Sequence, residues 1–397
     1  MPRLLPCPRP RLLAHPLPPV TACLLLCAAG VAQTASFTYQ ELAQHVYQFT
    51  DTSSGATATA WAWDFDDDGI ADDTNQNPVW AFPGAGVYPV TLTTTFGATT
   101  ASVTETLFVD HIQMSPFTNT YTSSSQTRGY WFQAPLRFSI VALSVPDESQ
   151  HGLQNVAVYR MDGAPPIYTA STTGGLAFFE AGVQTGSQIP CVISFDAGEY
   201  VGVLGACGDA TTMRNSYGAP LNADILGVQA QLTRFLTQTN IVSNGGTGPY
   251  SQTTGGPIAR VYAQVTPCAG IPYGDGSPSS QAAAPRLATT ALPFLGQTGE
   301  LTVDNFEPGV LGILAVGIGR ANAPSPIGTV LLATVDGSVT LNNGAPMNAG
   351  SYTFQWPIPN NPALQGFGPV NWQALTLNPT SGEFALSNGN EWWLSTP

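Results

Sequence analysis

The chain alternates short strand-like runs with turn-forming residues from residue 36 to its end. Runs of β-branched and aromatic residues, such as VYPVTL (residues 87–92) and FSIVALSV (residues 138–145), are separated by clusters of Gly, Pro, Asn and Ser. No long window shows the 3.6-residue period of an amphipathic helix. This pattern predicts an all-β protein built from β-sandwich domains.

Length and composition set the number of domains. The 397 residues include 41 Gly and 34 Pro, and only 9% are charged, which excludes a coiled coil or a long-helix protein. Hydrophobic residues make up 43%, enough to build packed cores, and the length exceeds what one core supports. We expect three β-sandwich domains in tandem after a leader, at residues 33–110, 111–267 and 268–397, with boundaries near Asp110 and Pro267.

The N-terminal segment, residues 1–32, has the pattern of a secretory signal peptide. Three arginines and no acid precede an apolar run at residues 20–31, and the small residues Gly30 and Ala32 precede Gln33. The run is too short to span a membrane. We therefore expect cleavage before Gln33 and a secreted or cell-surface protein without a membrane span. A lipid anchor on Cys23 is the alternative, less favoured because the most apolar stretch follows that cysteine.

The cations are all arginine, 11 in number, and the chain has no lysine. Walker A phosphate loops, lysine Schiff bases and Ser-Lys dyads are therefore excluded. Without residues 1–32 the chain has 8 arginines against 25 acids, a net charge of −17. Because nucleic-acid binding depends on clustered cations that neutralise phosphates, no nucleic-acid partner is expected.

The first domain carries a specific local pattern. The run WAWDFDDDG (residues 61–69) alternates large aromatic residues on one face and then turns, and FPGAGVYPVTL (residues 82–92) places Tyr88 at the start of a strand after a glycine turn. Together these residues resemble the PKD domain over about residues 36–110. The sequence departs from that family where Asp66 and Asp67 replace its first Gly, and where Asp68 is added. The resemblance implies an immunoglobulin-like sandwich that serves as a spacer or interaction module rather than an enzyme.

The acidic turn of this domain offers the one metal-ligating pattern. Asp64, Asp66, Asp68, Ile70 and Asp72 fall on positions 1, 3, 5, 7 and 9 of the EF-hand loop. Position 12 is Asn75 instead of the bidentate Glu, and no helices flank the loop. Two interpretations stay open: a solvated Asp-rich turn, which is favoured, and a weak extracellular Ca²⁺ site. No other cofactor is expected.

Three cysteines remain after the leader. Cys191 and Cys207 flank a predicted strand pair, and in an exported protein we expect a disulfide between them that contributes about 3 kcal/mol. Cys268 is left free, or is the true partner of one of the other two. Because no CxxC pair exists and the three remaining histidines are scattered, a structural zinc site is not expected.

The two later domains resemble modules of exported bacterial proteins only weakly. In the second domain, Tyr130 and Trp131 suggest an exposed platform for stacking sugars. The strand period of 2 favours the other interpretation, in which alternate members of the run Tyr130-Trp131-Phe132 belong to the core.

The sequence favours a non-catalytic protein. It has no G-x-S-x-G motif and no His beside a nucleophile. We expect a secreted or cell-surface multidomain protein that mediates adhesion or matrix contacts with an extracellular or cell-envelope protein or polysaccharide. The first alternative is a carbohydrate-binding accessory protein of extracellular polysaccharide degradation, which needs a coplanar exposed Trp/Tyr strip. The second is an extracellular hydrolase with paired carboxylates, for which the candidates are Glu148, Glu180, Glu199, Glu300 and Glu307.

Overall fold

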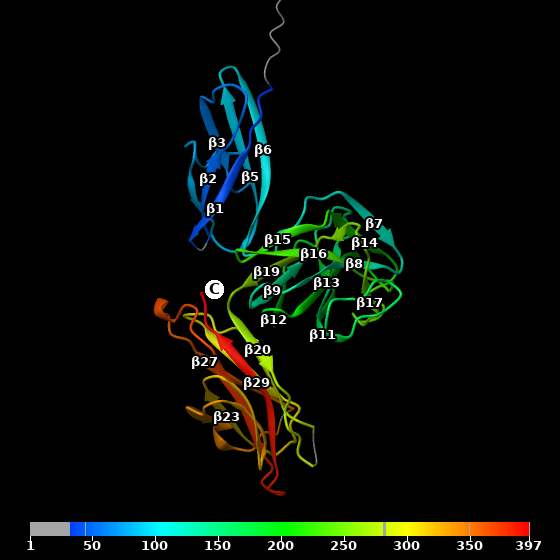
Figure 1. The fold of residues 1–397 in the computed structure, drawn as a ribbon, viewed down its shortest axis with the longest axis vertical. Coiled ribbons are helices and arrows are strands. Elements are labelled where there is room, and N and C mark those ends of the chain that lie inside the picture. The colour runs from blue at the N-terminus through cyan, green and yellow to red at the C-terminus, as the bar shows by residue number, and fades with distance from the viewer. Residues whose placement is uncertain (1–31, 44, 281–282, 349, 397) are drawn as a thin grey trace, which may run out of the picture.

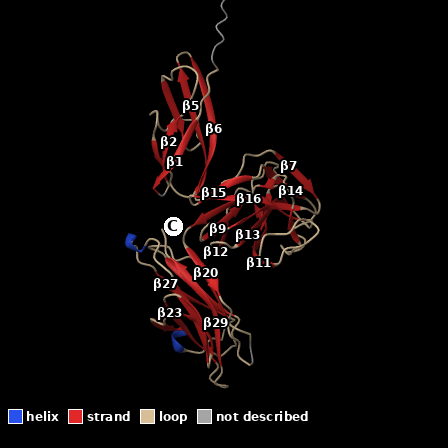
Figure 2. Cartoon of the chain, in the orientation of Figure 1, coloured by secondary structure: helices blue, strands red, loops and turns tan. Residues whose placement is uncertain are grey.

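The computed structural model describes residues 32–43, 45–280, 283–348 and 350–396, and this part of the chain is almost entirely β (Figures 1 and 2). Its elements are strands β1 to β29 and two 3₁₀ turns, η1 (Leu341–Gly344) and η2 (Pro362–Leu364). The predicted all-β fold class is confirmed. Residues 1–31 of the predicted leader lie outside the described residues. No helix in the described ranges has the length and hydropathy of a membrane span.

The first domain is a sandwich of two three-stranded antiparallel sheets with an aromatic core. Phe49, Trp63 and Phe65 are completely buried between the sheets, as the alternation in residues 61–65 predicts. The Tyr88 hydroxyl donates a hydrogen bond to the Gly84 carbonyl at 3.0 Å, which forms the tyrosine corner of immunoglobulin-like domains. The sheets are β1 (Phe37–Ala43), β2 (Val46–Asp51) and β4 (Val79–Ala81), and β3 (Ala60–Asp64), β5 (Gly86–Phe96) and β6 (Thr99–Val109).

The second domain packs a large sheet, in the order β11-β10-β13-β8-β16-β15, against the smaller sheet β12-β9-β19. Strands β10 and β13 are buried on both faces, because loops cover the side that faces away from the smaller sheet. The strands are β7 (Asn119–Ser123), β8 (Thr127–Gln133), β9 (Phe138–Ser144), β10 (Leu153–Met161), β11 (Gly174–Gln184), β12 (Ile189–Phe195), β13 (Tyr200–Gly208), β14 (Met213–Gly218), β15 (Leu221–Ile225), β16 (Val228–Thr237), β17 (Tyr250–Gln252), β18 (Ile258–Ala259) and β19 (Tyr262–Thr266).

The third domain is a sandwich of a five-stranded and a three-stranded sheet, in the orders β20-β29-β28-β23-β26 and β21-β22-β27. Trp372 and Trp392 fill its core with ring centroids 5.4 Å apart. A hairpin of β24 and β25 forms a separate two-stranded sheet, and β25 is joined to β28 by hydrogen bonds between Leu331 N and Gln373 Oε1 and between Gln373 Nε2 and Thr329 O, both at 3.0 Å. The strands are β20 (Ala269–Tyr273), β21 (Arg286–Ala291), β22 (Thr298–Asp304), β23 (Leu311–Gly317), β24 (Arg320–Ser325), β25 (Gly328–Leu332), β26 (Gly337–Thr340), β27 (Ser351–Pro357), β28 (Val370–Leu377) and β29 (Phe384–Trp393).

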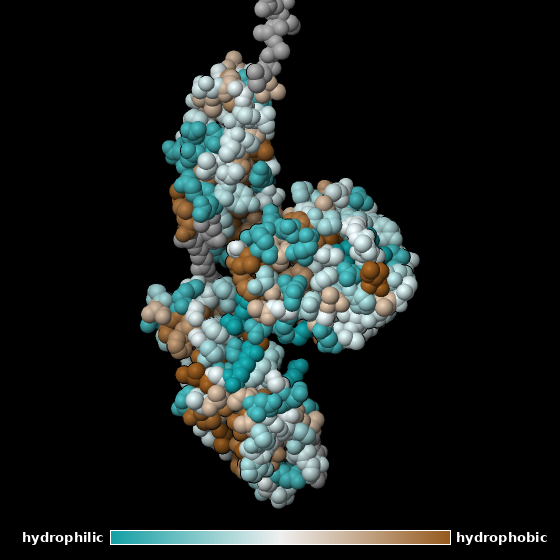
Figure 3. Space-filling model, viewed as in Figure 1, coloured by the Kyte–Doolittle hydropathy of each residue, from teal (hydrophilic) through white to brown (hydrophobic). Residues whose placement is uncertain are grey.

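Part of the outer surface of the third domain is apolar. Ile313 on β23 is 38% exposed and pairs with Leu375 on β28. Phe384 on β29 is 37% exposed and pairs with Leu377 on β28. Figure 3 shows brown, hydrophobic side chains over the β23 side of this domain. The larger sheet therefore leaves apolar side chains on its solvent side as well as in the core.

Short connections hold the three domains together. Strand β6 ends at Val109, and the segment after it is tied to β19 by hydrogen bonds from Val265 N to Asp110 O (2.7 Å) and from Ile112 N to Ala263 O (2.9 Å). Strand β19 ends at Thr266 and β20 begins at Ala269, so two residues separate the second domain from the third.

Candidate functional site

The Asp-rich turn begins where β3 ends, and Trp63 anchors it. The Trp63 backbone N–H donates to Asp73 O at 2.8 Å, and the indole Nε1 donates to Asn75 O at 2.9 Å. Phe65 is buried beside Trp63, with the two rings parallel and 5.8 Å apart. Both ends of the turn are thus fixed to the aromatic core, while the acids between them face solvent.

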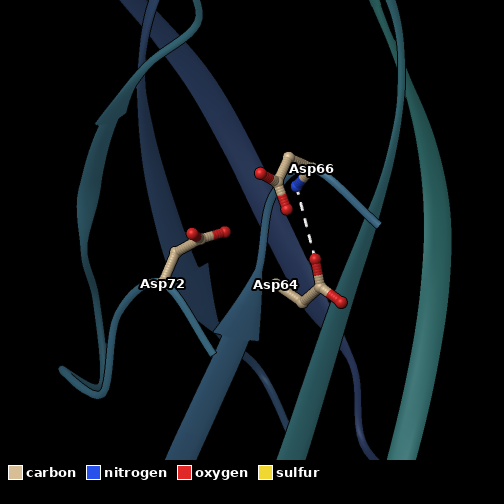
Figure 4. Close-up of side chains that lie close together, drawn as sticks. All are labelled: Asp64, Asp66 and Asp72. Carbon is tan, nitrogen blue, oxygen red and sulfur yellow. Dashed lines mark hydrogen bonds between the residues drawn. The ribbon is translucent and has the colours of Figure 1, made fainter. Parts of the chain in front are cut away.

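Three carboxylates of the turn converge (Figure 4). Asp64, Asp66 and Asp72 each place one oxygen within 4.8 Å of the others. Backbone N–H groups orient them: Asp64 accepts from Asp67 N (2.7 Å) and Gly69 N (2.9 Å), and Asp72 accepts from Phe65 N (2.7 Å). The geometry is that of a small cup of hard oxygen ligands, the type that Ca²⁺ prefers.

Asp68 is not part of this group, and Ile70 would contribute only its backbone carbonyl. The Asp68 carboxylate accepts a hydrogen bond from the backbone N–H of Ile70 at 2.7 Å. The structure therefore brings together three of the four predicted carboxylates, and the contribution of the Ile70 carbonyl stays a prediction. Gly69, with a φ of 81°, makes the sharp turn that position 6 of the EF-hand loop requires, and Asp67 adds a second positive φ of 63° before it.

Electrostatics favour a cation at the cup. Desolvation in the turn, followed by the negative charges of Asp68 and Asp72, raises the pKa of Asp66 above its usual value. A bound cation would relieve this repulsion. Asn75 stands where the EF-hand loop has its bidentate Glu and offers no carboxylate, so the further ligands would be neutral oxygens. Such a site would be weak, and both the solvated-turn and the calcium interpretation stay predictions.

The proposed sugar-stacking platform is not present on the second domain. Tyr130 and Phe132 are in the core, at 0% and 1% exposure. Trp131 is half-buried, and its Nε1 donates to Gln252 Oε1 at 3.2 Å. Alternate members of the run are core residues, as the strand period predicts.

Other tryptophans also fail to form an exposed strip. Trp372 and Trp392 are buried, and Trp393 is half-buried beneath the Arg137 guanidinium, 3.8 Å from the ring centroid. Trp356 is 37% exposed, and its ring packs edge-on against Trp372 at 5.3 Å.

The predicted disulfide between Cys191 and Cys207 is wrong, because both residues and Cys268 are free thiols. Cys191 lies on β12, which pairs with β9, whereas Cys207 lies on β13, in the other sheet of the domain. The two strands follow each other in the chain without pairing. Burial raises the pKa of the Cys191 and Cys268 thiols to about 12, so they stay protonated and are poor nucleophiles.

The histidines of the described residues do not form a nucleophile–base pair. His45 lies 2.6 Å from Asp110, His151 lies 3.7 Å from Asp209, and the Nδ1 of His111 lies 2.8 Å from the Val109 carbonyl. No serine, threonine or cysteine is hydrogen-bonded to His111 or His151.

Four of the five candidate glutamates bind separate partners. Glu148 pairs with Arg260, Glu199 with Arg160, and Glu300 with Gln355, while Glu307 accepts from Ser279 and Asn378. Because these partners lie on different elements, the described contacts nominate no carboxylate pair for hydrolysis.

Comparison with known families identifies the first domain. Residues 28–109 match the family model of the PKD domain, which confirms the resemblance drawn from residues 61–69 and 82–92. This domain is thus an immunoglobulin-like PKD domain. No curated protein matches the sequence.

Two solved structures show only distant likeness. One comes from work on the structural basis for the promiscuous specificity of carbohydrate-binding modules from the β-sandwich superfamily. It is 12% identical to this chain, covers 51% of this chain and 96% of its own, and has a TM-score of 0.20. The other, apo β-glucuronidase 3 of Bacteroides uniformis, is 10% identical over 85% of this chain and 34% of its own, with a TM-score of 0.15. At these TM-scores neither likeness bears on the function of this chain.

Proposed function

We propose that this chain is a non-catalytic secreted or cell-surface protein in which tandem β domains contact an extracellular or cell-envelope protein or polysaccharide. The observation that carries the proposal is the PKD domain at residues 28–109, joined by short connections to two further β domains. Such an arrangement presents binding surfaces at fixed spacing and requires no catalytic group of its own.

The contacts that the arginines make within the chain support a protein or polysaccharide partner rather than a nucleic acid. Each of the eight arginines in the described residues contacts an acid, a backbone carbonyl or a tyrosine of the same chain. These internal contacts already occupy the cations that would neutralise phosphates. A nucleic acid is therefore not the proposed partner.

The carbohydrate-binding alternative is the second candidate function, and one observation favours it. A cleft between the first two domains is lined by aromatic rings and hydrogen-bonding side chains, the combination that small-molecule and sugar sites use. In this version of the proposal the protein holds polysaccharide for separate degrading enzymes.

The proposed function is tested by measuring whether the protein is retained on a defined panel of insoluble polysaccharides and envelope fractions. Leader-free protein is incubated with insoluble cellulose, chitin, xylan and mannan and with washed bacterial envelope fractions, and the pelleted fraction is measured with and without Ca²⁺. Serum albumin serves as an acidic control that reports non-specific adsorption. Retention on at least one surface, above that of albumin, is expected. Recovery of all protein in every supernatant would contradict the proposal.

A further inference from the structure

The cleft between the PKD domain and the second domain has a built polar and aromatic lining. Its volume is about 280 Å³, and Figure 1 shows the β15–β16 hairpin lying against the end of the PKD domain from which β6 leaves. Strands β1, β2 and β6, the segment after β6, and the β15–β16 turn all contribute. The lining residues that matter below are Tyr39, Tyr47, Phe108, His111, Gln113 and Asp224.

The cleft is held open by the connection between the domains. Asp110 and Ile112 are bonded to the backbone of β19, and Gln113 N donates to Asp224 O at 3.3 Å, with a return bond from Asp224 N to Gln113 Oε1 at 3.3 Å. His45, in the turn between β1 and β2, contacts Asp110 at 2.6 Å. Since both walls are tied to one connecting segment, a ligand would meet a preformed site, which lowers the entropic cost of binding.

One wall of the cleft is aromatic. Tyr39 is 37% exposed, and its ring lies edge-on to that of Tyr47, with the centroids 6.3 Å apart. Phe108 also lines the cleft and is held by the Tyr262 ring at 5.8 Å. Aromatic side chains offer a large apolar face together with, for tyrosine, a polar tip, and so suit ligands that have both kinds of surface.

The polar feature of the cleft is an unsatisfied histidine. His111 is 5% exposed, and its Nδ1 must donate to the Val109 carbonyl at 2.8 Å, since a carbonyl only accepts. Its Nε2 is then an acceptor, and it is buried without a hydrogen-bond partner. Buried polar atoms without a partner are rare in folded proteins, and this one belongs to a residue that lines a cleft. Burial also lowers the pKa of His111, which keeps the acceptor form at neutral pH.

The charge of the cleft selects against anions. Asp224 is the charged residue in the lining, and its oxygens accept from Gly227 N (2.9 Å) and Gln229 Nε2 (3.1 Å). Burial and the negative charges of Glu105 and Asp224 raise the pKa of Tyr39, so the field at this wall is negative. No arginine lines the cleft.

We propose that this cleft binds a neutral saccharide. One sugar face packs on Tyr39, a hydroxyl donates to Nε2 of His111, and further hydroxyls donate to Asp224. The volume lies near the lower limit of about 300 Å³ for small-molecule sites, which fits one or two sugar units of a longer chain. The proposal rests on the proposed function as a binding protein and names the ligand class and the site.

The experiment is calorimetric titration of the leader-free chain with cellohexaose, xylohexaose, mannohexaose and, as the anionic arm, an oligogalacturonate. Binding of at least one neutral oligosaccharide is expected, with the oligogalacturonate bound more weakly. Tyr39→Ala and His111→Phe are each expected to weaken that binding about tenfold or more, a change of 1.4 kcal/mol. Tyr168→Ala, which removes a 49% exposed tyrosine of the second domain outside the cleft lining, is the matched control and should leave the affinity unchanged.

The outcomes separate this proposal from the proposed function. Thermal melting confirms that each variant is folded, and Tyr39→Ala carries the test should His111→Phe not fold. Tyr39→Phe, which keeps the ring, is expected to keep the affinity for the neutral sugar. Neutral-sugar binding that neither Tyr39→Ala nor His111→Phe weakens would overturn the cleft proposal while leaving a binding protein. Tighter binding of oligogalacturonate would overturn the choice of a neutral ligand. An absence of binding to all four sugars, with retention on envelope fractions, would overturn the saccharide proposal alone.

Discussion

Replacing Arg320 with alanine should destabilise the third domain and loosen its junction with the second. Arg320 binds Glu391 through two hydrogen bonds, Nε to Oε2 at 2.8 Å and Nη2 to Oε1 at 3.1 Å, and Nη2 also reaches Asp196 of the second domain at 3.0 Å. The Glu391 side chain is 5% exposed and that of Arg320 38%. The substitution therefore leaves a buried carboxylate without its cation.

The size of the destabilisation depends on the hydrogen bonds that Glu391 keeps in the variant. Breaking a fully buried ion pair costs about 3–5 kcal/mol. Arg320 is partly solvated, and Glu391 still accepts from Trp393 Nε1 (2.7 Å) and Asn371 Nδ2 (3.2 Å), so the loss should be smaller. We expect about 2 kcal/mol, the value of strong hydrogen bonds to a charged group, and a fall in melting temperature of roughly 5–10 °C.

The pH dependence gives the same prediction a second readout. Burial alone would raise the pKa of Glu391, but the hydrogen bonds and charge of Arg320, together with Trp393, hold it below its usual value. A carboxylate with a lowered folded-state pKa adds stability above its unfolded pKa, and that stability is lost as the pH falls through the folded value. The difference between wild type and Arg320→Ala should therefore shrink in acid.

Differential scanning calorimetry of the full leader-free chain is the assay, and Arg286→Ala is the matched control. Arg286 makes a similar pair with Asp304, at 3.0 Å, but its side chain is 69% exposed, so its loss should cost less than about 1 kcal/mol. If Arg320→Ala lowered the melting temperature no more than Arg286→Ala does, the reasoning from burial would be refuted.

Three further predictions concern the turn, the junction and the thiols. If the Asp-rich turn binds Ca²⁺, with a dissociation constant of about 10⁻⁴–10⁻³ M, millimolar calcium should raise the melting temperature, and Asp66→Ala should abolish the rise. A melting temperature that is the same in calcium and in chelator would contradict the calcium interpretation and leave a solvated turn. Because burial lowers the pKa of His111, the unfolded state binds more protons, so stability should fall as the pH drops below the unfolded pKa of 6.5. If His111→Phe left this dependence of the melting temperature on pH unchanged, the effect would belong to another group. Thiol titration in denaturant without reductant should find all three cysteines of the described residues free, and a count of one would indicate a bridge.

Local patterns made the first domain predictable. The spacing of Trp63 and Phe65 on one strand face, and of Tyr88 after its turn, depends only on neighbouring residues, and each takes the expected place in the core or corner. Three of the predicted turn ligands converge for the same reason. Asp68 does not join them, because its carboxylate accepts from the backbone N–H of Ile70 instead.

Long-range pairing was not predictable in the same way. The Cys191–Cys207 bridge assumed that consecutive strands pair, whereas β12 and β13 join different sheets and find their partners elsewhere in the chain. The cleft between the PKD domain and the second domain was not predicted from the sequence, because Tyr39, His111 and Asp224 come from separate segments. The only local signal was a lone histidine at a predicted domain boundary, and its burial follows from the packing of two domains.

The central claim, binding without catalysis, is tested most directly by measuring new reducing ends in the polysaccharide suspensions that retain the protein. Aliquots are taken over an extended incubation at several protein concentrations. The account predicts retention with no release above that of buffer alone. A release that grows linearly with time and with protein concentration would contradict it and establish a hydrolase.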